Sequence, residues 1–332
     1  VSDDAIETAA ADHGLRGEHA RILDVRRNSL FDAAAAVSTV TWLDEHFRSV
    51  PHIIGFSDRA FYNGNLRLMT QHPAVENRDA IHTISLAGDR NEAGVNEQEL
   101  EVVLDQVREL ANKGITSIGV VSPFRAQADA IEEAILATYS PEDVDRIGLR
   151  VGTVHAFQGS ERDVIVASVA IGPDDAAGSL RFLQDPNLFN VMVTRARQEM
   201  IIVTSVGPGD LPDGLLSRYL RHADHAPRST DVTLLPEGWT GEVFEQLQRF
   251  GVPVTAGYPV AGWSVDLAVG ETESVFGVEC RVHPDGAVVH VAQHLALRRA
   301  GWSLIDAFQS RWLTDSDGAA EMISKQVLRN QT

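Results

Sequence analysis

The stretch from residue 148 to residue 170 reads GLRVGTVHAFQGSERDVIVASVA and decides the fold. Two apolar, β-branched runs, 148–154 and 163–170, lie on either side of a polar segment that contains Gly159. Short runs of this kind, bounded by turn residues, are typical of buried strands. The stretch therefore predicts two strands of a sheet that is covered on both faces.

The flanking sequence extends this pattern in both directions. SIGVVSP (117–123) and EMIIVTSV (199–206) are further apolar runs with strand character. Residues 95–113 and 124–139 instead repeat their apolar positions with helical spacing. Strands that alternate with helices predict a mostly parallel sheet with helices on both faces, which is an α/β fold.

The residue composition changes after Val206, where VGPGDLPDG (206–214) is rich in glycine and proline. A short basic helix is predicted at 215–222. From residue 237 a second pattern starts, with a helix at 241–250, a hairpin-like region at 253–283, a helix near 290–300, and a final strand and helix. At the other end, residues 1–30 read as polar helix, and the spacing from Ser29 to Glu45 suits another helix.

We therefore predict four segments. They are an N-terminal helical remnant at 1–30, a parallel-sheet α/β domain at 31–206, a linker with a short helix at 207–236, and a smaller α/β domain at 237–332. A chain of 332 residues with 44% hydrophobic composition is long enough for two packed domains.

Composition limits the function classes. The formal net charge of −19 argues against nucleic acid as a partner, although net charge is a global sum and a binding groove is local. A single cysteine, Cys280, excludes an internal disulfide and a cysteine-based zinc cluster. We expect a cytoplasmic protein without membrane contact, because no basic and apolar leader and no run of about 20 apolar residues is found.

Four segments resemble the motifs of one enzyme family. VGTVHAFQGSERDVIVAS (151–168) resembles helicase motif V, and NVMVTRARQEMIIV (190–203) resembles motif VI. LDEHFRSVPHIIGFSDRAFYNG (43–64) resembles motif IV with its flank, and SPFRAQ (122–127) resembles the element that grips the nucleic-acid backbone. Their order and spacing are similar to those of the second RecA-like domain, domain 2A, of superfamily 1B helicases, in the nonsense-mediated-decay-like and DNA-replication-helicase-like branch. The resemblance covers roughly residues 40–205.

The resemblance implies roles for particular residues. Two arginines of this domain would reach across a cleft to ATP, where they stabilise charge on the transferred phosphoryl group; by motif they are Arg48 and Arg195. Arg197 is a second candidate, more typical of a structural residue. The side chains implied to face the nucleotide are Gln158, Gly159 and Glu161. Those implied to contact nucleic acid are Ser122, Arg125, Gln127, Thr153 and His155. The alternatives are surface ion pairs for the arginines, including Arg125 with Asp129.

A P-loop needs a Gly-Lys dipeptide, and neither lysine of this chain, Lys113 or Lys325, follows a glycine. The sequence thus holds one half of a site for ATP and Mg²⁺. We expect the other half on an N-terminal helicase domain, either in cis, in a longer protein, or on a partner subunit. Alone, the chain should not hydrolyse ATP.

The last hundred residues resemble the restriction-endonuclease-like, PD-(D/E)xK fold, especially very-short-patch-repair-like domains. The resemblance rests on GEVFEQLQRFGVPVTAGYPVAGWSVDLAV (241–269), FGVEC (276–280) and LALRRAGWSLIDAFQSRWLTD (295–315). It implies Mg²⁺ bound by Asp266 and Glu279, with Glu242 or Glu245 as a further ligand. Arg281 stands where relatives usually have lysine; it could hold phosphate but is too basic to act as a general base. Proteins of this fold usually carry a basic helix that also contains Asp. In this chain its basic residues are reduced to His290, His294, Arg298 and Arg299.

These observations predict the C-terminal part of an ATP-dependent DNA helicase or translocase that works on single-stranded DNA, with an appended nuclease domain that is active or degenerate. Family analogy adds DNA repair or defence. Two alternatives stay open: a stand-alone metal-dependent DNA nuclease, and a non-catalytic DNA-binding module. A metabolite enzyme on a doubly wound sheet would need a glycine-rich phosphate loop, which is absent.

Overall fold

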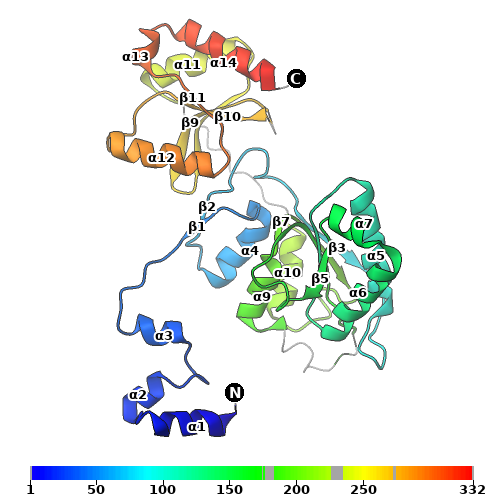
Figure 1. Cartoon of the computed structure of the whole chain (residues 1–332). Helices are drawn as coiled ribbons and strands as arrows, with labels where there is room; N and C mark the ends of the chain where they lie inside the picture. Colours follow the sequence, from blue (N-terminus) through cyan, green and yellow to red (C-terminus); the bar gives the residue numbers. More distant parts are fainter. Residues whose placement is uncertain (1, 174, 176–182, 226–234, 272–273, 331–332) are drawn as a thin grey trace. The chain divides into compact units, whose positions relative to one another are not determined.

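The computed structural model describes the whole chain except residues 1, 174, 176–182, 226–234, 272–273 and 331–332 (Figure 1). It divides into two compact units, Val1–Asp44 and Glu45–Thr332. These units meet at 44/45, and the domain boundary at 30/31 stays a prediction. The predicted linker at 207–236 lies partly outside the described residues.

The first unit holds three short helices, α1 (Asp3–Asp12), α2 (Gly17–Ile22) and α3 (Leu30–Ala35), none of which has a buried residue. Ser29 begins α3 with a capping box, in which its hydroxyl accepts from the Asp32 amide. The helix predicted from Ser29 to Glu45 was therefore wrong beyond Ala35. Valine and threonine dominate 37–41, and their branched side chains lower helix propensity.

The largest sheet of the second unit has five strands, all parallel, in the order β3-β7-β6-β4-β5. Its strands are β3 (Ile81–Ser85), β4 (Ile118–Ser122), β5 (Arg150–Thr153), β6 (Arg162–Ser168) and β7 (Ala196–Thr204). The predicted α/β class and four of these strands are confirmed. Strand β3 was not predicted, because its burial pattern leaves only Ile81 fully buried.

Side chains alternate between two cores, as the pleat of a strand requires. On β6, Ile165 and Ala167 enter one core while Val164 and Val166 enter the other. Figure 1 shows α4 (Pro51–Phe61), α9 (Pro186–Val193) and α10 (Leu215–Ala223) on one face of the sheet. Helices α5 (Glu97–Asn112), α6 (Arg125–Thr138) and α7 (Pro141–Arg146) cover the other face.

Helix α10 was expected in the linker, but it packs inside the first core. Leu215, Leu216, Tyr219 and Leu220 are buried there together with residues of α4 and α9. Tyr219 contacts Phe56 edge to face, with ring centroids 4.9 Å apart. The glycine and proline residues at 206–214 thus mark a turn within the domain and not its end.

The C-terminal domain has a four-stranded sheet of order β11-β10-β9-β8. Its strands are β8 (Val254–Val260), β9 (Trp263–Val269), β10 (Phe276–Glu279) and β11 (Leu304–Asp306). Only β10 and β11 are parallel. Ala261 and Gly262, both at positive φ, form the tight turn between β8 and β9.

Four helices complete this domain: α11 (Gly238–Arg249), α12 (Ala287–Arg299), α13 (Gln309–Trp312) and α14 (Ser316–Asn330). The predicted series of helix, hairpin, helix, strand and helix is confirmed. Over the described part of the chain, no helix combines the length and apolarity that crossing a membrane requires.

Two histidines fasten α10 to α4. His222 Nε2 lies 2.9 Å from the His52 carbonyl oxygen, and His52 Nδ1 accepts from the Ala80 amide at 3.0 Å. Arg59 donates to His222 Nδ1 at 2.9 Å. Because each ring uses one nitrogen as an acceptor, both must be neutral. Burial lowers the pKa of His222 to about 4 and also lowers the pKa of His52.

We predict that this domain loses stability as the pH falls from 6.5 towards 4. The unfolded chain binds a proton at His222 near its ordinary pKa of 6.5, whereas the folded chain binds it only near 4. Acid in this window therefore favours unfolding. Urea unfolding between pH 7.5 and 4.5 should show a shallower pH dependence for His222→Gln. The exposed His19 supplies the control, since His19→Gln should keep the wild-type slope; an unchanged slope in His222→Gln would contradict the prediction.

Candidate functional site

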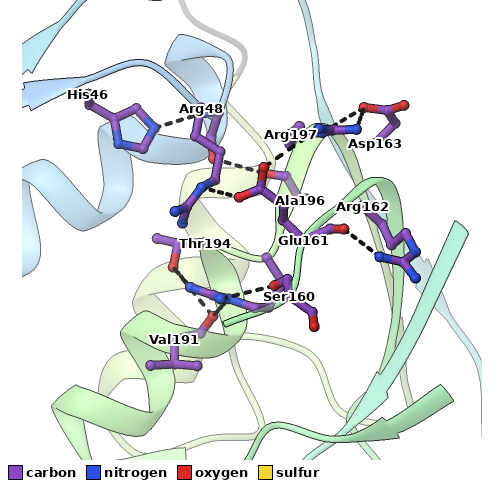
Figure 2. A network of polar contacts seen from close by, with 12 residues as sticks. His46, Arg48, Ser160, Glu161, Arg162, Asp163, Val191, Thr194, Ala196 and Arg197 are labelled. Carbon is purple, nitrogen blue, oxygen red and sulfur yellow. Dashed lines mark hydrogen bonds and ion pairs between the residues drawn. The ribbon is translucent and has the colours of Figure 1, made fainter. Parts of the chain in front are cut away.

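Several arginines gather where β6 and β7 begin. Figure 2 shows this edge, where Arg48 and Arg197 point to the Glu161 carboxylate and Arg162 donates to the Glu161 carbonyl. Parallel strands start at the same edge of a sheet, so motifs distant in sequence meet here. The pairing of Arg162 with Ala196 places the two strand starts side by side.

Arg195, between α9 and β7, is buried with 9% of its surface exposed. Its Nε donates to the Val191 carbonyl at 2.7 Å, one Nη to the Ser160 carbonyl at 3.0 Å, and the other to the Thr194 hydroxyl at 3.2 Å. All three acceptors are neutral. Within the described part of the chain no carboxylate lies within ion-pair distance of Arg195. Burial, and then the neighbouring Arg48, lower its pKa from the usual value.

Glu161 lies between two arginines of this edge, Arg48 and Arg197. It forms an ion pair with Arg48 Nε and a longer one, 3.5 Å, with Arg197 Nη1. Arg197 also binds Asp163 at 2.8 Å. A cavity of about 440 Å³ opens beside these side chains. Its lining residues are Glu45, His46, Phe47, Arg48, Glu161 and Arg197.

The segment that carries Arg48 is tied to the start of β7. The Val50 amide donates to the Arg197 carbonyl at 2.9 Å, and the Ser49 hydroxyl donates to the Ala196 carbonyl at 2.8 Å. The Ser49 amide donates to His46 Nε2 at 2.8 Å. Burial and nearby Arg48 lower the pKa of His46 to about 4, which keeps that acceptor nitrogen unprotonated near neutral pH.

Two further arginines, which the sequence did not single out, hold the connection between β5 and β6. Arg150 donates to the Ser160 hydroxyl at 2.7 Å and the Ala156 carbonyl at 2.6 Å. Arg162 donates to the Gly148 and Glu161 carbonyls, both at 2.8 Å. Motif comparison missed them because most of their acceptors are backbone oxygens, which leave no mark in the sequence. Their position at the starts of the two predicted strands was the available signal.

The other residues expected on the nucleotide side lie in this connection. Gln158 and Gly159 are exposed, and Gly159 has φ +83° with open space where a Cβ would stand. The backbone conformation, and not a close neighbour within the chain, therefore accounts for this glycine.

The opposite edge of the sheet carries most of the residues expected to meet nucleic acid. Ser122 and Thr153, at the ends of β4 and β5, are register partners. Arg125 begins α6 and is exposed, as is His155. Ser122 itself is 1% exposed. The alternative ion pair of Arg125 with Asp129 is not formed; Arg125 has no ion pair among the residues described.

Gln127 does not join this group, because its side chain is buried and engaged. Its Oε1 accepts from the Asn96 amide at 2.8 Å, and its Nε2 donates to the Asn96 carbonyl and the Ser168 hydroxyl, both at 3.1 Å. Ser168 in turn donates to buried Glu99, which also accepts from Ser205 and the Ala170 amide. Burial raises the pKa of Glu99. Gln127 thus joins the starts of α5 and α6 to the end of β6, and Glu99 extends these contacts to Ser205, just after β7.

In the C-terminal domain, Asp266 and Glu279, the predicted magnesium ligands, both contact nitrogen donors. Asp266 accepts from the Cys280 and Arg281 amides at 2.8 and 3.2 Å and from Arg281 Nε at 3.1 Å. Glu279 bonds His294 Nδ1 at 2.7 Å, with His290 3.9 Å away. Mg²⁺ prefers oxygen ligands and retains water. Both oxygens of Asp266 and Oε2 of Glu279 thus have nitrogen partners, whereas Glu279 Oε1 is buried without a hydrogen-bond partner among the described residues. Magnesium binding at this pair stays a prediction.

The remaining ligands expected there are not assembled either. Glu242 and Glu245 are exposed on α11, and Glu245 pairs with Arg249. In the described parts of the chain, no three or more His, Cys, Asp or Glu side chains are arranged to hold a metal ion.

Comparison with known proteins agrees with the geometry of the parallel sheet. A family model described as an AAA domain matches residues 26–207, more than half of the chain. The chain belongs to this AAA domain family. The family match and the similarity to helicases together support a superfamily 1 helicase-like domain in this chain.

Three of these relatives are helicases. "Putative helicase mov-10-B.2" of Danio rerio is 30% identical over 63% of this chain and 23% of its own length. Helicase sen1 of Schizosaccharomyces pombe is 32% identical over 39% of this chain and 8% of its own. DNA polymerase alpha-associated DNA helicase A of Saccharomyces cerevisiae is 26% identical over 50% of this chain and 28% of its own. The chain thus spans less than a third of each relative.

We predict that Asp266→Ala destabilises the protein by about 1–3 kcal/mol, because two backbone amides and Arg281 lose their acceptor. Millimolar Mg²⁺ should leave the wild-type melting temperature unchanged. Thermal unfolding with and without Mg²⁺ measures both effects. Asp285→Ala is the control, since the Asp285 side chain is 77% exposed. A Mg²⁺-dependent rise in melting temperature that disappears in Asp266→Ala would show that the carboxylates bind metal after all.

Proposed function

We propose that this AAA domain supplies the arginine half of an ATP site in a superfamily 1 helicase, while a P-loop on another domain, in cis or on a partner subunit, supplies the other half. The observation that carries the proposal is Arg195, a buried cation bonded only to neutral oxygens. A desolvated charge without a counter-ion is costly, and an anion brought to it removes that cost. The γ-phosphate of ATP is such an anion.

Local charge supports the same ligand. Arg48, Arg150, Arg162, Arg195 and Arg197 surround this edge, together with two carboxylates, Glu161 and Asp163. Glu45 also lines the cavity and pairs with Arg67, so six cations minus three anions give a local excess of three positive charges in a chain of net charge −19. Potentials depend on such local arrangements, so an acidic protein can still attract a polyphosphate here.

The roles divide by position. Arg195, fixed by three hydrogen bonds, would stabilise charge on the transferred phosphoryl oxygens. Arg48 is 41% exposed and held by Glu161, so it can exchange this carboxylate for a phosphate. Glu161, when released, could accept from a ribose hydroxyl. Because both arginines lie on a domain without a P-loop, ATP hydrolysis would depend on closure of the two domains.

We place nucleic acid at the opposite edge, where Ser122, Arg125, Thr153 and His155 lie. Hydroxyls, an arginine and an imidazole at strand ends suit phosphate oxygens. Gln127 would act indirectly, by holding the start of α6. We propose single-stranded DNA as the ligand and directed movement along it as the activity of the complete helicase.

Of the competing functions, a stand-alone nuclease would require metal at Asp266 and Glu279, which their present partners disfavour. We propose instead that the C-terminal domain is a degenerate PD-(D/E)xK-like domain that supports the motor. Mg²⁺-dependent DNA cleavage lost in Asp266→Ala and Glu279→Ala would favour the nuclease. DNA binding without any response to polyphosphate would favour a passive binding module.

The nucleotide role predicts that inorganic tripolyphosphate binds this chain at Arg195. NMR spectra of arginine Nε–H groups should show the Arg48 and Arg195 signals shifting together, and Arg195→Gln should remove the response. Arg146→Gln is the matched control, because Arg146 is 61% exposed on α7. With the P-loop domain present, Arg195→Gln should lower the turnover of ATP roughly 10³-fold, with a smaller change in KM. Equal small shifts at exposed arginines would contradict the proposal.

The nucleic-acid role predicts that Arg125→Ala weakens binding of single-stranded DNA and lowers the slope of log affinity against log salt by about 1, since one phosphate contact is lost. Fluorescence anisotropy at several salt concentrations measures this slope. Arg108→Ala, on the exposed side of α5, should behave as wild type. If both variants lower the slope equally, binding is a diffuse surface effect.

A further inference from the structure

Met69 is a core residue of the C-terminal domain although it lies far from it in sequence. It is completely buried, in a cluster with Tyr258, Val260, Val265 and Trp302. Every other buried member of this cluster falls between residues 258 and 304. Met69 is therefore a link from the AAA domain into the smaller domain.

The segment that contains Met69 holds the segment that carries Arg48. Strand β2 (Arg67–Leu68) pairs in parallel with β1 (Glu45–His46). The Met69 amide donates to the His46 carbonyl at 2.9 Å, and Arg67 binds Glu45 at 2.8 Å. A pair of two-residue strands has little stability of its own. The burial of Met69 gives this pair a fixed position.

Three more contacts join residues 47–76 to the C-terminal domain. The Arg299 guanidinium, at the end of α12, lies 5.7 Å from the centre of the Phe47 ring. Phe47 precedes Arg48 in the sequence. The His72 and Trp302 rings are 4.4 Å apart, and the Tyr258 hydroxyl donates to Glu76. The C-terminal domain thus contacts 47–76 on both sides of β2.

We propose that the C-terminal domain positions Arg48, with Met69 as the positioning residue and Arg299 as a second support through Phe47. This inference rests on the proposed function, since Arg48 is the arginine assigned there to ATP. The domain then acts as a brace for the nucleotide-facing loop. A ligand or partner that displaces it from Met69 would loosen Arg48 and leave Arg195, which is held by α9 and the 160 segment, in place.

The test compares NMR signals of arginine Nε–H groups in the full chain. In Met69→Ala the Arg48 signal should broaden or vanish, amides at 46–49 should exchange faster, and the Arg195 signal should persist. Met69→Leu should restore the wild-type spectrum, since it refills the same space. Ile323→Ala is the matched control: Ile323 is completely buried in the same domain, in a cluster that contains no residue of 45–76.

An unchanged Arg48 signal in folded Met69→Ala overturns the proposal, as does an equal loss in Ile323→Ala. If Met69→Ala does not fold, Arg299→Ala serves in its place, because that side chain is exposed; it should broaden the Phe47 and Arg48 signals, and no change would again overturn the proposal. Tripolyphosphate separates this inference from the proposed function. If tripolyphosphate shifts neither the Arg48 nor the Arg195 signal in the wild type, while Met69→Ala still broadens the Arg48 signal, the positioning role of the C-terminal domain is supported and the ATP role is contradicted.

Discussion

The buried charge of Arg195, which is hydrogen-bonded only to neutral oxygens, constrains much of the AAA domain. Its side chain needs the Val191 carbonyl from α9 and the Ser160 carbonyl from the β5–β6 connection. Both must therefore lie at the start of β7, which fixes how α9 and this connection pack against the sheet. The acceptors are neutral, so they hold the guanidinium in place without cancelling its charge. The same three hydrogen bonds therefore fix the position of the Arg195 guanidinium and leave its charge available to attract an anion.

The connection between β5 and β6 joins the two edges of the sheet. It leaves β5 at Thr153, on the edge where we propose that nucleic acid binds, and reaches β6 at Arg162, on the arginine edge. Because the two strands are parallel, these few residues must cross the height of the sheet without a helix. Arg150 and Arg162 hold their backbone oxygens at one end. Backbone hydrogen bonds join Thr153 to Phe157 and Phe157 to Ser160, whose carbonyl accepts from Arg195, so this connection is a continuous set of contacts between the two edges.

Sequence reasoning recovered what depends on local pattern. Apolar runs located β4, β5, β6 and β7. Motif order singled out Arg48 and Arg195, which lie at the same edge of the sheet, while their role at ATP stays a prediction. It failed where tertiary contacts decide. Gln127 has the residue type of a phosphate contact, yet Asn96 and Ser168, far along the chain, engage it. Met69 gives no signal in a polar stretch, because the cluster that buries it lies about 200 residues later. Asp266 and Glu279 match a metal pattern whose outcome depends on their partners.

The near absence of lysine acquires a physical meaning at the arginine edge. Of 28 basic residues only Lys113 and Lys325 are lysine, and both pair with glutamates on exposed helix surfaces. A lysine buried like Arg195 could shed its proton and become neutral, because its pKa falls readily on burial. Burial lowers the pKa of Arg195 as well, but an arginine starts so high that it stays charged. Its planar group also reaches three separate acceptors. A permanent, rigid and unpaired cation can therefore be kept inside this fold only as arginine.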